Sequence, residues 1–143
     1  MKVLVDTCIW SLSLRRKKVA NDPYVRESKK LIEEYKSQML GPIRQEILSS
    51  IRAQEQFEKL QMHLGAFPDL PIATRDYERA AEFFNTCRRQ SIQGSNTDFL
   101  LCAVGERHEM PIFTFDDDFK SFADCLPITL HSTEQPFSIV GQA

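Results

Sequence analysis

The side chains with the clearest potential for chemistry in this sequence are five acids: Asp6, Glu46, Asp98, Asp116 and Asp118. Carboxylates held a few ångströms apart repel one another, and each raises the pKa of its neighbours. A fold tolerates such a cluster when a divalent cation neutralises it, and ligand sets made only of oxygen suit Mg²⁺ or Mn²⁺. A cation held in this way polarises a phosphoryl oxygen and lowers the pKa of an attacking water. If the acids converge, they favour metal-dependent hydrolysis of phosphodiester bonds.

The elements that must position these acids are short apolar strands alternating with amphipathic helices. Strands are expected at residues 3–5, 39–41, 70–73, 111–115 and 127–130. Helices are expected at 24–38, from Pro42 to about 51, around 57–64, at 77–87 and at 95–104, with a short helical turn at 116–122. This alternation predicts one α/β domain in three α/β/α layers, with a central parallel sheet of four to five strands. One of the two helices before the 111–115 strand is expected to lie across the sheet.

In a parallel sheet of this kind, ligands bind at the carboxyl ends of the strands. Asp6 directly follows the first strand, and Glu46 lies in the first turns of the helix after the second strand. Asp98 begins the helix that leads into the 111–115 strand, and Asp116 and Asp118 follow that strand. Four separate segments therefore deliver acids to one edge of the sheet.

Each acid also has an ordinary structural interpretation. Asp98 completes the pattern Ser95-x-x-Asp98, in which an acid stabilises a helix N-terminus. Glu46 alone could be a helix-surface residue, and residues 116–118 could cap a short helix. Asp6 is harder to explain structurally, because an unpaired charge at the end of a buried strand is costly. The functional interpretation rests on the convergence of four positions rather than on any one of them.

The length, hydrophobic content and net charge of the chain limit the classes of protein to which it can belong. The chain has 143 residues, 42% of them hydrophobic, and a formal net charge of -2, so a strongly basic nucleic-acid-binding class is not indicated. It carries neither a signal-peptide pattern nor an apolar run long enough to span a bilayer, which places it in the cytoplasm by expectation. Its four cysteines form no C-x-x-C pair and are expected to be reduced and buried. Positive charge is gathered in Arg15, Arg16, Lys17 and Lys18, which together with Arg44 could contact the phosphates that flank a cleaved bond.

Four motifs in order give the chain a family resemblance. They are Val3-Leu4-Val5-Asp6-Thr7 with Trp10, Pro42-Ile43-x-x-Glu46-Ile47-Leu48, Ser95-Asn96-Thr97-Asp98 with the apolar run 99–103, and Thr114-Phe115-Asp116-Asp117-Asp118-Phe119. In their order and spacing the chain resembles the PIN-domain family, and within it the VapC-type toxins of bacterial toxin–antitoxin pairs, from Met1 to about Leu130. Cys102 and Val104 stand at packing positions where smaller residues, Ala or Thr are more usual.

The resemblance implies a metal-dependent endoribonuclease that uses Mg²⁺, with Mn²⁺ as a substitute. It implies a nuclease domain at 1–131 with a tail at 132–143, an RNA substrate such as transfer or ribosomal RNA, a small antitoxin partner and a homodimer. The implied catalytic residues are Asp6, Glu46, Asp98 and Asp116, the implied metal ligands are Asp6, Asp98, Asp116 and Asp118, and Thr7 and Thr114 are implied as supporting hydroxyls.

Other classes fit the same residues less well. A dehalogenase-like phosphatase needs a second Asp two residues after the first-strand Asp, and Cys8 stands there. A response-regulator receiver needs an acidic pair beside the first strand and a Lys near the last one, whereas Asp6 stands alone. The remaining alternative is a non-catalytic PIN-like module that binds RNA or another protein. The presence of all four acids favours the enzyme.

Overall fold

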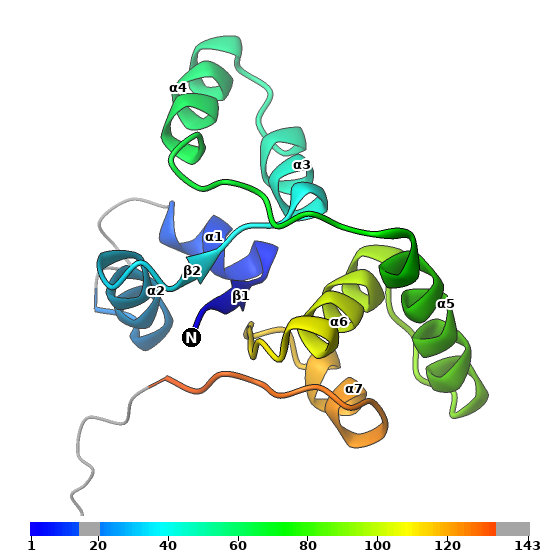
Figure 1. The fold of residues 1–143 in the computed structure, drawn as a ribbon. Helices are drawn as coiled ribbons and strands as arrows, with labels where there is room; N and C mark the ends of the chain where they lie inside the picture. Colours follow the sequence, from blue (N-terminus) through cyan, green and yellow to red (C-terminus); the bar gives the residue numbers. More distant parts are fainter. Residues whose placement is uncertain (15–20, 134–143) are drawn as a thin grey trace, which may run out of the picture.

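A three-stranded parallel sheet lies at the centre of the molecule (Figure 1). The structure is a computed structural model, and it describes residues 1–14 and 21–133. β1 (Val3–Val5) pairs with β2 (Ser37–Gln38) on one side and with β3 (Ile112–Phe113) on the other, giving the order β2-β1-β3. All three residues of β1 are buried, and successive strand residues face opposite sides, so both faces of the sheet are covered.

Seven helices surround the sheet in the part of the chain that the structure describes. Figure 1 shows α1 and α2 on one side of the strands and α6 on the other, as expected for a parallel sheet. The helices are α1 (Thr7–Ser13), α2 (Pro23–Glu33), α3 (Gly41–Ser49), α4 (Gln54–Leu64), α5 (Thr74–Arg89), α6 (Asn96–His108) and α7 (Asp118–Cys125). None of them is long and apolar enough to cross a membrane.

The predicted number of four to five strands is wrong for the described residues. The segment expected as a strand at 127–130 forms only a single parallel bridge, Ile112 with Leu130. The segment expected at 70–73 forms no strand, and a single bridge just before it joins Met39 to Asp69. Pro68 and Pro71 flank the first bridge, and a proline has no backbone N–H to donate to a ladder. The outer segments are therefore held to the sheet at one position each instead of forming strands.

The second strand begins two residues earlier than expected because α2 is shorter than its apolar pattern. Tyr35 has a φ of 58°, in the left-handed region, and it breaks the helix that the sequence extended to residue 38. The Lys36 N–H then donates to the Leu31 carbonyl over 2.8 Å and closes the helix end. The chain is extended from there into β2, so that α3 can begin at Gly41 beside the sheet edge.

Helix α6 forms the inner helical layer on its side of the sheet. Its residues 99–105 are all buried, a pattern that indicates a helix enclosed on every side. It contacts β3 on one side and α5 on the other, so α5 is an outer helix packed on α6 rather than one laid across the sheet. The start of α6, where Asp98 lies, is thus fixed from two directions.

Two ion pairs attach α5 to α6. Asp76 is only 1% exposed, and it accepts hydrogen bonds from Arg107 Nε over 2.6 Å and Nη2 over 2.7 Å. Its other role is to accept the Ala73 N–H at the start of α5. These hydrogen bonds hold the pKa of the Asp76 carboxyl below its usual range. Arg79 pairs with Glu106 closer to solvent.

Gly94 sets the approach of α7 to the start of α6. A Cβ at this position would lie 2.5 Å from Cζ of Phe122 and 3.0 Å from the ring of Phe99. The two rings themselves pack with their centroids 4.9 Å apart. Only glycine leaves room for this contact, which brings the acids at the starts of α6 and α7 toward the same edge.

Candidate active site

Asp6 lies where β1 passes into α1, with 7% of its surface exposed. Its Oδ1 accepts the Thr7 N–H over 2.8 Å, and its Oδ2 accepts the Thr114 hydroxyl over 2.8 Å. Burial raises the pKa of the Asp6 carboxyl, these hydrogen bonds lower it in part, and the charge of Asp98 raises it again. Asp6 is therefore a buried carboxylate whose two oxygens both accept hydrogen bonds and which has an acidic neighbour.

Glu46 is brought to Asp6 by the Thr7 side chain. Thr7 Oγ1 donates to Glu46 Oε1 over 2.6 Å, a bond that joins the first turn of α1 to the middle of α3. α3 begins just after β2, so Glu46 starts from the same sheet edge as Asp6. Glu46 itself is exposed, and its carboxylate is open to a water or a ligand.

Asp98 has both of the roles that the sequence allowed. It completes a capping box: Ser95 N–H donates to Asp98 Oδ2, and Asp98 N–H donates to Ser95 Oγ, each over 3.1 Å. Its pKa is nevertheless raised, first by burial, then by the charges of Asp116 and Glu46, against the lowering effect of the Ser95 bonds. The charges of Asp116 and Glu46 thus act on Asp98, and the charge of Asp98 acts on Asp6.

Asp116 lies in the turn between β3 and α7, and Asp118 is the first residue of α7. The Asp116 N–H donates to Thr114 Oγ1 over 3.0 Å, so one hydroxyl orients both Asp6 and the Asp116 backbone. Asp116 Oδ1 accepts the Asp118 N–H over 2.9 Å. Among residues 1–14 and 21–133, the exposed Asp118 carboxylate has no hydrogen bond or ion pair. The structure thus brings together Asp6, Glu46, Asp98 and Asp116, with Asp118 at their edge.

The donor set fits a hard divalent cation in its chemistry. All the charged groups are carboxylates, and the pKa values of Asp6 and Asp98 are raised by burial and by their acidic neighbours. A cation would relieve that repulsion. Within the described residues, no set of three or more His, Cys, Asp or Glu side chains is already arranged around one point as metal ligands. The carboxylates are neighbours, and holding an ion requires them to adjust.

The basic residues expected to bind RNA do not reach this cluster in the described part of the chain. Arg44 is engaged elsewhere: its guanidinium donates to Asp69 Oδ1 over 3.0 Å, to the Leu64 carbonyl over 2.9 Å and to the Phe67 carbonyl. These bonds fasten the segment after α4 to α3. Arg15, Arg16, Lys17 and Lys18 lie outside the described residues.

Cys8 is a site residue that the sequence analysis treated only as a small buried hydrophobe. Its Sγ lies 3.3 Å from Thr114 Oγ1, donates to Asp6 Oδ2 over 3.6 Å and accepts the Phe115 N–H over 3.5 Å. Burial raises the pKa of the thiol. Its position two residues after Asp6, in the first turn of α1, was the available signal.

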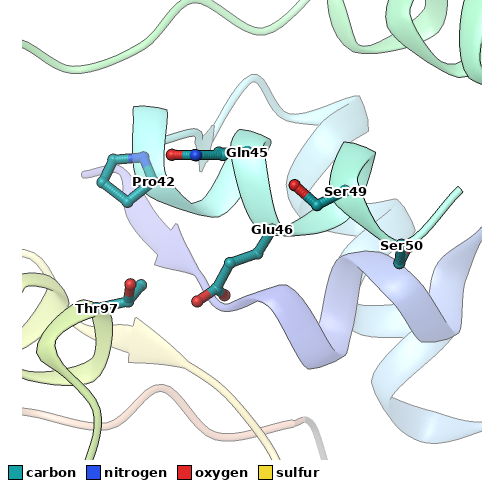
Figure 2. Close-up of a pocket in the computed structure, with 6 residues that line it drawn as sticks. All are labelled: Pro42, Gln45, Glu46, Ser49, Ser50 and Thr97. Atoms are coloured by element: carbon teal, nitrogen blue, oxygen red, sulfur yellow. The ribbon is translucent and has the colours of Figure 1, made fainter.

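An open pocket of about 530 Å³ adjoins the cluster, with Glu46 as a shared residue. It lies between α3 and the first turn of α6 (Figure 2). The residues that line it are Pro42, Gln45, Glu46, Ser49, Ser50 and Thr97.

Removal of one clustered charge is expected to stabilise the cation-free protein. A folded pKa above the ordinary aspartate value of about 3.9 means that the folded state binds the proton more tightly, so stability is present below that value and lost as pH rises through the folded pKa. At neutral pH the full repulsion acts. Asp98→Asn removes it while Asn retains some capping ability, and should raise the melting temperature in chelator by about 2–4 °C.

Thermal melts in chelator and in Mg²⁺ measure this effect. Mg²⁺ should stabilise the wild type more than Asp98→Asn, because an ion that binds only the folded site stabilises it by mass action. Asp124→Asn, an exposed acid on α7, is the matched control. If Asp98→Asn melts lower in chelator and Mg²⁺ shifts neither protein, Asp98 acts only as a helix cap.

Comparison with known proteins identifies a matching family and several solved structures with a similar fold. The family model of the PIN domain matches residues 3–124. Among solved structures, the chain is similar to FitAcB from Neisseria gonorrhoeae, with a TM-score of 0.72 and 18% identity over 91% of this chain and 96% of that one. It is also similar to VapBC2 from Rickettsia felis bound to a DNA fragment from its promoter, with a TM-score of 0.69 and 16% identity over 92% and 98% of the two chains.

A third solved structure, a toxin–antitoxin complex from Klebsiella pneumoniae, has a TM-score of 0.61 and 20% identity over 82% of this chain and 90% of that one. No match was found among curated proteins. At these identities the structures establish a shared fold, and the family model establishes the family.

Proposed function

The chain belongs to the PIN domain family, and from that premise we propose that it is a metal-dependent endoribonuclease, the toxin of a toxin–antitoxin pair. The observation that carries the proposal is the position of Asp98. Burial raises its pKa, and the charges of Asp116 and Glu46 raise it further. Its own charge adds to the effect of burial on the pKa of Asp6. Four segments far apart in sequence supply these acids. A purely structural role would not require them to be neighbours.

In this proposal, Asp6, Asp98 and Asp116 would hold the cation, with Asp118 as a further ligand. Mg²⁺, or Mn²⁺ in its place, would neutralise the acids, stabilise charge on the phosphoryl oxygens and lower the pKa of a nearby water. Thr114 orients Asp6 and the Asp116 backbone through one hydroxyl. Thr7 holds Glu46 at the open side of the cluster. Glu46 can there accept a proton from the water that attacks the phosphorus.

The proposed partners follow from the family and from the similar structures. The similar structure from Klebsiella pneumoniae is a toxin–antitoxin complex, and this chain has a comparable fold over most of its length. We expect it to bind a small antitoxin in the cytoplasm, to form a homodimer and to cut a structured RNA such as transfer or ribosomal RNA.

Incubation of the purified protein with total cellular RNA tests the proposal. In Mg²⁺ we expect discrete new 5′ ends, which sequencing of the products locates. Chelator should abolish them, and added Mn²⁺ should restore them, because the acid cluster alone lacks the positive charge that the reaction needs. RNA that is bound but left intact in every metal would instead favour a non-catalytic PIN-like module.

A further inference from the structure

The pocket beside Glu46 extends the acid cluster along α3. Figure 2 shows the Glu46 carboxylate reaching toward Thr97 at the start of α6, with Pro42 on one side of it and Ser49 and Ser50 on the other. Thr97 directly precedes Asp98, and Glu46 accepts the Thr7 hydroxyl next to Asp6. A molecule in this pocket would therefore lie against the group of acids described above. Its volume of about 530 Å³ is within the ~300–1,000 Å³ usual for small-molecule sites.

The charge of the lining indicates which part of a nucleic acid the pocket can take. Glu46 is the one charged residue that lines it, and neither Lys nor Arg is among the lining residues. A phosphate placed here would meet a carboxylate with no cation of the protein to balance it, and like charges repel. The pocket therefore fits the uncharged part of a nucleotide, its base and ribose.

Several polar groups in the pocket are free to recognise such a ligand. The Ser50 hydroxyl is already used, because it donates to the Ile47 carbonyl over 2.7 Å. In the described part of the chain, the side chains of Gln45, Ser49 and Thr97 make no hydrogen bond. An amide offers two donors and an acceptor, and a hydroxyl offers both functions, which are the groups that pair with base edges and with a 2′-hydroxyl. Pro42 adds an apolar surface for the face of a base.

We propose that this pocket binds the nucleoside next to the scissile phosphate, with Gln45 and Ser49 hydrogen-bonding its base or ribose. The inference rests on the proposed ribonuclease function and adds to it a determinant of sequence preference. The phosphate lies at the acids, where a cation would hold it, and the neighbouring nucleoside extends along α3. Specificity at that nucleotide comes from α3 and the start of α6.

A random-sequence RNA pool is the probe, with cleavage followed by fluorescence and the product ends sequenced. The double variant Gln45→Ala/Ser49→Ala loses two hydrogen-bonding side chains, and should raise the apparent KM about tenfold with kcat within about twofold. It should also lose the preference for one base beside the cut that the wild type shows. The salt dependence of binding should be unchanged, because no phosphate contact is removed. Gln61→Ala, an exposed glutamine of α4, is the matched control and should behave as wild type.

A second variant, Ser49→Tyr, fills the pocket from an exposed position and should weaken RNA binding more than the double alanine variant. If the double alanine variant and Ser49→Tyr both keep the wild-type KM and base preference, the proposed role of the pocket is wrong. The proposed nuclease activity would still stand, provided that Glu46→Gln abolishes cleavage. Normal cleavage combined with weaker antitoxin binding would also overturn it, and would make the pocket a protein-docking site. If the wild type cuts no RNA, or Glu46→Gln cuts at the wild-type rate, the proposed function itself fails and the pocket proposal fails with it.

Discussion

Asp6→Asn is expected to lower the rate of RNA cleavage at least about a hundredfold while the protein stays folded. Loss of residues that only support metal ligands typically costs about 10–100-fold, and the proposed role of Asp6 is that of a ligand itself. Asparagine retains an oxygen for the Thr7 N–H and a polar group for the Thr114 hydroxyl, so local geometry should persist. The substitution also removes a carboxylate whose pKa is raised by burial. The folded state should therefore be at least as stable as the wild type at neutral pH.

The measurement combines cleavage of cellular RNA in Mg²⁺ with circular dichroism and a thermal melt. Asp124→Asn makes the same chemical change at an exposed acid outside the cluster and should cleave normally. A folded Asp6→Asn protein that cuts RNA at the wild-type rate would show that the acid cluster is not the catalytic site. If Asp6→Asn and Asp124→Asn both cleaved RNA more slowly than the wild type and to a similar extent, the result would point to a general effect of charge on RNA association.

Arg107→Ala is expected to cause the largest loss of stability of any change discussed here, lowering the melting temperature on the order of 10 °C. Asp76 is 1% exposed, and both of its oxygens accept hydrogen bonds from Arg107. Removal of the guanidinium leaves a buried carboxylate with only the Ala73 N–H as a partner. Breaking one side of a buried pair is costly because the remaining charge is neither solvated nor balanced.

The pH dependence distinguishes this mechanism from a simple loss of packing. The pKa of Asp76 is lowered in the folded wild type, so the stability it contributes is present above the ordinary aspartate value and lost as pH falls through the lower folded value. In Arg107→Ala the buried Asp76 carboxyl prefers to be protonated. The difference in melting temperature between this variant and the wild type should therefore shrink as pH falls toward about 4.

Melts of two further variants complete the test. Arg79→Ala removes a more exposed partner of Glu106 and should lower the melting temperature only slightly, because exposed ion pairs contribute little to stability. The double variant Asp76→Asn/Arg107→Ala removes the buried charge as well and should recover part of the loss. Equal destabilisation by Arg107→Ala at pH 4 and pH 7 would contradict the electrostatic explanation.

The positions of the acids could be predicted from the sequence because each depends on local rules. Asp6 follows a short apolar run, and Ser95-x-x-Asp98 is a capping pattern that identifies a helix start. In a parallel sheet, strand ends and helix starts of these kinds meet at one edge, so local signals were enough to place four acids there. Their electrostatic coupling in the structure agrees with that placement.

What the sequence could not predict depends on contacts between distant segments. Arg44 follows the second strand, as a residue of the site would. Its guanidinium nevertheless donates to the carbonyls of residues 64 and 67 and to the carboxylate of Asp69. Cys8 contacts Thr114, more than a hundred residues away, and no periodic pattern records that contact. The strand count was too high because an apolar run of four residues satisfies a strand pattern whether it forms one bridge or a full ladder.

The single bridges at the two sides of the sheet have a consequence for the behaviour of the protein at high concentration. An unpaired strand edge is a template on which another chain can add a strand, and such pairing leads to aggregation. Here Met39, directly after β2, pairs with Asp69 in a segment that has prolines at 68 and 71. The edge of β3 is covered at Ile112 by the segment after Pro127. A proline in an outermost segment removes a donor that an incoming strand would need. These short, proline-containing borders make the small sheet a poor nucleus for intermolecular β-structure.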